Sequence, residues 1–148
     1  MYRKILIAAD GSELANKAVG HGVKLAKEVG ASVIFVTVTE RWSAIQMVEE
    51  AETGSSDPIG RYEGLATKSA QNILAAAKTT AESNGVACET LHVPDGLPAE
   101  AIVATANEKG CDLIVMASHG RRGLSRLVLG SQTAEVLAYS KVPVLVLR

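Results

Sequence analysis

Glycine, hydroxyl and arginine residues gather in one short stretch in the last third of the chain. The stretch opens with Ser118-His119-Gly120, closes with Gly130-Ser131, and carries Arg121, Arg122 and Arg126 between them. A glycine-containing turn that leads into a helix N-terminus favours an anion, because unpaired backbone N–H groups and the positive end of the helix dipole attract it. The residues indicate phosphate binding. A second interpretation stays open, in which a glycine turn, a solvated arginine pair and an ordinary helix cap lie side by side.

The elements that must position this stretch alternate between strands and helices. Continuous aliphatic runs predict buried strands, and apolar residues at three- and four-residue steps predict helices packed on a sheet. The predicted strands are 5–9, 31–38, 86–93, 113–117 and 142–147, and the predicted helices are 13–29, 62–84, 99–109 and 130–139. This order predicts one doubly wound α/β domain over residues 1–148, with a five-stranded parallel sheet and helices on both faces. The polar residues 41–60 predict a flexible loop.

The composition narrows the class of protein. The 148 residues include 15 basic and 16 acidic side chains, a net charge of −1, and 47% are hydrophobic while only 3% are aromatic. The balanced charge gives no support for general nucleic-acid binding. Cys88 and Cys111 are too few for a disulfide scaffold, and no apolar run reaches the roughly 20 residues that span a bilayer. The apolar run that begins at Ile5 stops at Asp10, too short for a signal peptide. We expect a cytoplasmic protein without nucleic-acid or membrane partners.

Ligands of an open parallel sheet bind beyond the carboxyl ends of its strands, where the winding reverses. The loop after the first predicted strand contains Asp10. Its carboxylate either contributes to capping the first helix, whose predicted N-cap is Ser12, or faces a ligand. No Walker loop, dinucleotide glycine fingerprint or nucleophile elbow is present. No residue is placed as a general base and no carboxylate pair as a magnesium site. We therefore assign no catalytic and no metal-ligating residue, and expect slow hydrolysis at most.

Gly120, nine intervening residues and Gly130-Ser131 resemble the nucleotide-binding signature of the universal stress protein family, Gly-x2-Gly-x9-Gly-Ser/Thr. The similarity extends over essentially the whole chain and includes residues 5–12, 96–102, 112–117 and 142–147. One position departs from the signature, because Ala117 stands where the family has its first glycine. If that position needs a positive φ, alanine costs roughly 1 kcal/mol or more. If it needs only room for an extended backbone, the methyl group is tolerated.

The resemblance implies an adenine nucleotide alpha hydrolase-like fold with strand order 3-2-1-4-5. It also implies that ATP, or AMP or ADP, binds at the carboxyl ends of strands one and four, with Mg²⁺ or Mn²⁺ on the phosphates. The residues implied are Val38 and Met116 for the adenine, Asp10 for the ribose, Gly120, Gly130 and Ser131 for the phosphates, and Ala9, Ala117, Ser118, His119, Arg121 and Gln132 around them. From the residues alone, His119 is either a phosphate contact or incidental.

The final apolar run, from Val142 to Leu147, is apolar on both faces, and Pro143 places it at a sheet edge. A C2 homodimer through this edge would cover it, as the resemblance also implies; the alternative is an edge covered within its own chain. The leading hypothesis is an ATP-binding stress-response regulator. The alternative is a nucleotide-free, dimeric regulatory or interaction module. An adenylating enzyme and a response-regulator receiver fit poorly, because Asp10-Gly11-Ser12 is neither a Ser-Gly-Gly phosphate loop nor an acidic cluster.

Overall fold

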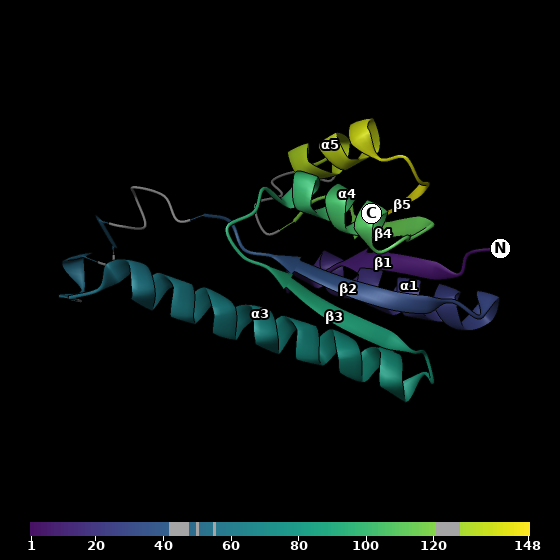
Figure 1. The fold of residues 1–148 in the computed structure, drawn as a ribbon, viewed down its shortest axis with the longest axis horizontal. Helices are drawn as coiled ribbons and strands as arrows, with labels where there is room; N and C mark the ends of the chain where they lie inside the picture. Colours follow the sequence, from purple (N-terminus) through teal and green to yellow (C-terminus); the bar gives the residue numbers. More distant parts are fainter. Residues whose placement is uncertain (42–47, 50, 55, 121–127) are drawn as a thin grey trace.

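The computed structural model describes residues 1–41, 48–49, 51–54, 56–120 and 128–148. Its elements are β1 (Lys4–Ala8), α1 (Glu13–Val29), β2 (Ser32–Val38), α3 (Pro58–Ser83), β3 (Cys88–Val93), α4 (Pro98–Glu108), β4 (Leu113–Ala117), α5 (Ser131–Tyr139) and β5 (Val144–Leu147). The strands form one parallel sheet in the order β3-β2-β1-β4-β5 (Figure 1). The predicted α/β fold and strand order are confirmed.

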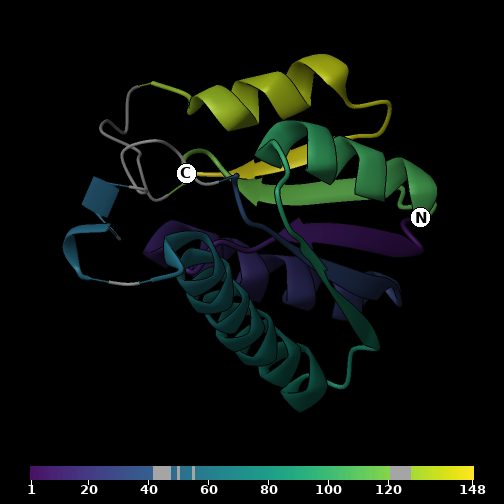
Figure 2. The same cartoon turned by 60° about the vertical axis from the view of Figure 1, so that its left-hand side comes forward.

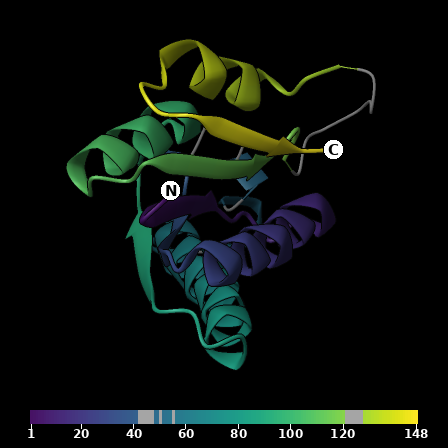
Figure 3. The same ribbon diagram turned by 90° about the vertical axis from the view of Figure 1, so that its right-hand side faces the viewer.

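The three central strands of the sheet, β1, β2 and β4, are buried on both faces because helices cover each side (Figures 2 and 3). Ile5, Leu6 and Ile7 of β1 are all 0% exposed; Ile5 and Ile7 pack under α1 and α3, whereas Leu6 packs under α4 and α5. Aliphatic residues are therefore required at the three central positions of β1, since none of them faces water. None of the helices in the described ranges combines the length and apolar character needed to cross a bilayer.

The winding of the sheet reverses between β1 and β4. These strands are neighbours, with Ile7 opposite Val115. After β1 the chain enters α1 on one face, whereas after β4 it reaches α5 on the other. Chain segments that leave in opposite directions open a crevice at the carboxyl ends of these two strands. Asp10 and the glycine stretch are thus brought to one place.

The start of α3 differs from the sequence prediction by four residues. The helix begins at Pro58 and not at Tyr62, because the Asp57 side chain accepts a hydrogen bond from Gly60 N (3.1 Å) and Pro58 occupies the first turn. The apolar pattern missed these turns, since Ala70 is the first buried residue of α3. The prediction of loop over 41–60 is also wrong at residues 48–49 and 51–52, which are helical. Residues 42–47, 50 and 55 lie outside the described residues.

The edge position of β5 is confirmed, and its start is later than predicted. Ser140 and Val142 close a turn through the Ser140 hydroxyl, and Pro143 contributes only its carbonyl, which accepts from Ile114 N over 3.0 Å. Pairing as a strand therefore begins at Val144. All four residues of β5 are half-buried. Every other boundary lies within two residues of its prediction.

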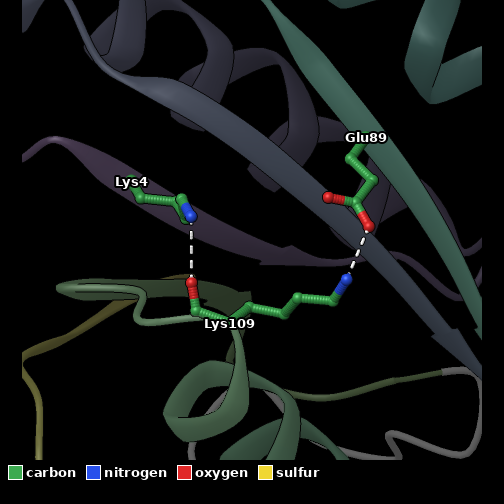
Figure 4. Close-up of polar contacts among 3 residues, drawn as sticks. All are labelled: Lys4, Glu89 and Lys109. Carbon is green, nitrogen blue, oxygen red and sulfur yellow. Dashed lines mark hydrogen bonds and ion pairs between the residues drawn. The ribbon is translucent and has the colours of Figure 1, made fainter.

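A polar link joins three elements at the amino end of the sheet (Figure 4). Lys4 Nζ donates a hydrogen bond to the Lys109 carbonyl oxygen (3.0 Å), and Lys109 Nζ lies 2.8 Å from Glu89 Oε1. Lys109 is the C-cap of α4, where a cation is favourable beside unpaired carbonyls. The link connects β1, β3 and α4 at the end of the sheet opposite the crevice.

Candidate functional site

A cavity of about 710 Å³ opens at the carboxyl end of the sheet, a volume within the usual range for small-molecule sites. Ten of the twelve residues singled out from the sequence line it, namely Ala9, Asp10, Val38, Met116, Ala117, His119, Gly120, Gly130, Ser131 and Gln132. Ser118 is buried next to His119 and does not line the cavity. Arg121, like Arg122 and Arg126, lies outside the described residues. The structure thus brings together segments that are more than 100 residues apart.

The carboxylate of Asp10 is fixed on the cavity wall. Its Oδ1 accepts a hydrogen bond from Ser12 N (2.8 Å), while Ser12 Oγ accepts from Ala15 N (3.2 Å). Ser12 is therefore the N-cap of α1, as predicted, and Asp10 supports the turn before it. The second oxygen faces Gly120, because a β-carbon on Gly120 would lie 2.7 Å from Asp10 Oδ2. The carboxylate of Asp10 thus lies beside the glycine stretch.

Gly130 touches the backbone at the end of β4. Its N–H donates to the Ser118 carbonyl oxygen over 2.8 Å. A β-carbon at this position would lie 2.9 Å from that oxygen and 3.0 Å from His119 Cα. Gly130 has φ −59°, which any residue adopts. Glycine is therefore required here because two backbone segments lie too close for a side chain, and not because the backbone is left-handed.

The N-terminus of α5 faces the cavity with its backbone donors unpaired within the helix. Gly130 is the N-cap and makes no side-chain capping bond, and Ser131 and Gln132 follow on the cavity wall. The first N–H groups of a helix lack intrahelical acceptors, and the dipole is positive at this end. This part of the cavity is built to attract an anion.

An apolar slot lies between the ends of β2 and β4. Val38 and Met116 belong to the same core cluster as Ile102 of α4, and all three line the cavity. The turn before α4 packs against the end of β2, because Gly96 N donates to Thr39 O (3.1 Å) and a β-carbon on Gly96 would lie 3.1 Å from Val38 Cγ1. A flat apolar ring suits such a slot.

Ala117 carries no backbone strain. In the part of the chain that the structure describes, Asp95 is the one residue other than glycine with a positive φ (53°). Ala117 ends β4, is 7% exposed and lines the cavity. Of the two possibilities raised by its sequence, the one that needs a positive φ is therefore excluded.

Two buried threonines also shape the site and were not predicted. Thr37 Oγ1 donates to the Ala9 carbonyl oxygen and Thr133 Oγ1 to the Ala117 carbonyl oxygen, both over 2.8 Å. Each hydroxyl satisfies a carbonyl at the point where a strand ends, which a buried backbone requires. Thr133 lies two residues after the end of the glycine signature at Ser131, but no local pattern in the sequence identifies its acceptor.

The titratable side chains on the cavity wall already have protein partners. His119 Nδ1 lies 3.2 Å from Ser118 Oγ, and Tyr62 of α3 donates to the Glu40 carbonyl oxygen (3.1 Å). Within the described ranges, no three His, Cys, Asp or Glu side chains come together as metal ligands would. The arrangement can bind and orient an anionic ring compound.

The sequence is similar to known proteins along its whole length. Residues 1–148 match the model of the universal stress protein family. Universal stress protein MJ0531 of Methanocaldococcus jannaschii is 35% identical over 148 residues, which cover all of this chain and 83% of that protein. Universal stress protein YxiE of Bacillus subtilis is 36% identical over 155 residues, with all of both chains covered.

Two solved structures are similar over nearly the whole chain. That of MJ0577 from M. jannaschii has a TM-score of 0.81 and 34% identity, covering 99% of this chain and 96% of the other. That of a universal stress protein in complex with cAMP has a TM-score of 0.73 and 25% identity, covering 99% and 97%. The chain belongs to the universal stress protein family.

Proposed function

We propose that this protein is a cytoplasmic stress-response regulator that binds ATP or AMP in the cavity at the carboxyl ends of β1 and β4. The observation that carries the proposal is the close contact of Gly130 with Ser118, which leaves the unpaired N–H groups of α5 facing the cavity. The relative solved with cAMP supports an adenine nucleotide as the ligand.

Each part of the nucleotide has a matching part of the cavity. The adenine would lie in the slot between Val38 and Met116, and the ribose hydroxyls would donate to Asp10. The phosphates would lie against the backbone of Gly120 and Gly130, with the hydroxyl of Ser131 as a further donor. In this assignment the base would contact apolar side chains, the sugar hydroxyls would contact hydrogen-bond acceptors, and the phosphates would contact hydrogen-bond donors.

The site fits a nucleotide that is held and not rapidly hydrolysed. Asp10 Oδ1 is held by Ser12 N, and in this assignment Oδ2 accepts from the ribose hydroxyls, so the carboxylate is not placed to activate water at the phosphates. Glu40 lies on the cavity wall as a further carboxylate. Mg²⁺ or Mn²⁺ would depend on phosphate oxygens for most of its ligands, because the described residues offer it no cluster of side chains.

Calorimetric titration of the purified protein with ATP, ADP, AMP and cAMP tests the proposal, with GTP as the control for the base. We expect saturable binding of an adenine nucleotide with a Kd below about 1 mM, and weaker binding of GTP. Absence of saturable binding would overturn the proposal and favour the nucleotide-free regulatory module.

The exposed edge of β5 supports a second proposal, a homodimer with C2 symmetry. Each of its four apolar residues is half-buried, and an unpaired strand edge invites pairing. Val146 belongs to neither core cluster, so Val146→Lys changes the edge and spares the core. Sedimentation should give a dimer for the wild-type protein and for Leu97→Lys, a change at an exposed site away from β5, and a monomer for Val146→Lys. A wild-type monomer at micromolar concentration would exclude the dimer.

A further inference from the structure

The N-terminus of α4 is capped by a side chain of α5. Leu97 is the N-cap residue of α4 and has no side chain that can accept a hydrogen bond. Gln132 Oε1, 33 residues away, accepts from Ala99 N over 3.0 Å. Because the first N–H groups of a helix lack intrahelical acceptors, Gln132 supplies what Leu97 cannot.

This contact fixes the orientation of the Gln132 amide. Since Ala99 N is a donor, the oxygen of the amide must face it, and both hydrogens of Nε2 point elsewhere. Gln132 is half-buried, and in the described part of the chain nothing accepts from its Nε2. Because Gln132 is only half-buried, its two N–H donors are available to water or to a ligand.

Gln132 lies on the wall of the cavity. Gln132 directly follows Ser131 in the first turn of α5, and both residues lie on the cavity wall. Gln132 also lines a neighbouring hollow, together with Gly96 and Pro98 of the turn before α4. Gln132 therefore lies where the first turn of α5, the start of α4 and the cavity meet.

We propose that Gln132 is a specificity-determining residue that donates from Nε2 to a phosphate oxygen and so selects phosphorylated adenine nucleotides over adenosine. The inference rests on the proposed function and adds a selection rule to it. With Oε1 turned toward Ala99 N, the two N–H donors of Nε2 point away from α4, so they favour an acceptor-rich group such as a phosphate. The same bond couples a bound phosphate to the N-terminus of α4.

Two variants separate this role from simple capping. Gln132→Glu keeps the length of the side chain and an acceptor for Ala99 N, but it replaces the two donors by an anionic oxygen. Gln132→Met keeps the approximate length and removes both functions. Ala134→Glu is the matched control, because it adds the same charge to the same turn of α5 at an exposed position outside the cavity lining.

Two quantities are measured for each variant. The first is the ratio of the Kd for adenosine to the Kd for AMP, and the second is the midpoint temperature of thermal unfolding. We expect Gln132→Glu to keep the wild-type midpoint and to lower the ratio by about tenfold or more, beyond any effect of Ala134→Glu. Gln132→Met should lower both the midpoint and the ratio.

The outcomes that oppose the inference are distinct from those that oppose nucleotide binding itself. If the wild-type protein binds AMP but Gln132→Met leaves the ratio unchanged, Gln132 is a cap alone and the inference is wrong. The same conclusion follows if Gln132→Glu and Ala134→Glu lower the ratio equally. A wild-type protein that binds neither AMP nor adenosine overturns both proposals.

Discussion

Gly130 and Ser118 are joined by a hydrogen bond of 2.8 Å, from the amide of the first to the carbonyl oxygen of the second. The bond attaches the N-cap of α5 to the residue that follows β4. It leaves no room for a side chain on Gly130. The orientation of the α5 N-terminus toward the cavity therefore depends on one backbone contact that only glycine permits.

Gly130→Ala should displace α5 and weaken nucleotide binding by about tenfold or more, with a stability loss of about 1–3 kcal/mol. The added β-carbon would lie 2.9 Å from the Ser118 carbonyl oxygen and 3.0 Å from His119 Cα, so backbone must move. Titration with AMP and urea unfolding measure the two effects. Gly64→Ala is the control, since a β-carbon there meets nothing within 4 Å. Equal affinities of the two variants would show that the contact does not position the site.

Asp10→Asn should keep the fold and weaken the binding of nucleotides that carry ribose hydroxyls. The amide oxygen still accepts from Ser12 N, so the turn before α1 is retained, but the charged acceptor for the ribose is lost. Asp10→Ala should in addition lose about 1 kcal/mol of stability, because Ser12 N loses its acceptor. The comparison is between ATP and its 2′,3′-dideoxy analogue. If Asp10→Asn weakens both ligands by the same factor, Asp10 does not contact the ribose hydroxyls.

Much of this architecture could be predicted from the sequence because it depends on local pattern. Aliphatic runs broken by glycine and capping residues define where each strand and helix lies, and Ser12 is the N-cap of α1 in the structure. The alternation of strands and helices then limits the topology, so the end of β1 and the glycine stretch after β4 meet at one edge.

The remaining features depend on pairs of residues that are distant in sequence. Gln132 caps a helix that begins more than 30 residues earlier, and the Thr133 hydroxyl finds the Ala117 carbonyl across the end of β4. Nothing in the neighbouring sequence distinguishes this glutamine or this threonine from others of its type, so neither hydrogen bond can be predicted from local pattern. The first turns of α3 were missed for another reason: they bury nothing, so hydrophobic periodicity carries no signal there.

Ala117→Gly should reduce stability by about 0.5–1 kcal/mol and change nucleotide affinity by less than about threefold. Glycine in a strand loses more conformational entropy on folding, while the extended backbone at this position gains nothing from it. Denaturant unfolding and AMP titration check the two values, and Ala8→Gly at the end of β1 is a comparable strand control. A gain in affinity of about tenfold or more would mean that the Ala117 methyl group obstructs the ligand.

Asp112→Asn should destabilise the protein at neutral pH, with the loss shrinking in acid. Burial acts to raise the pKa of Asp112, but hydrogen bonds from Arg3 N (2.9 Å) and Lys4 N (3.1 Å) outweigh it and leave the pKa below its usual value of 3.8. A depressed carboxyl pKa means that the ionised form stabilises the folded state above about pH 3.8, and that this contribution disappears as the pH falls through the folded-state pKa.

At pH 7 the Asp112→Asn variant should therefore be about 1 kcal/mol less stable than wild type, a value reduced for the partial exposure of the carboxylate. Urea unfolding at intervals between pH 7 and pH 3 should show the gap narrowing only below about pH 4, because a protonated Asp112 carboxyl, like the amide of the variant, accepts without a negative charge. Glu63→Gln on the exposed face of α3 controls for the loss of one negative charge. A gap that stays constant with pH would mean that the hydrogen bonds from Arg3 N and Lys4 N do not depend on the charge of Asp112.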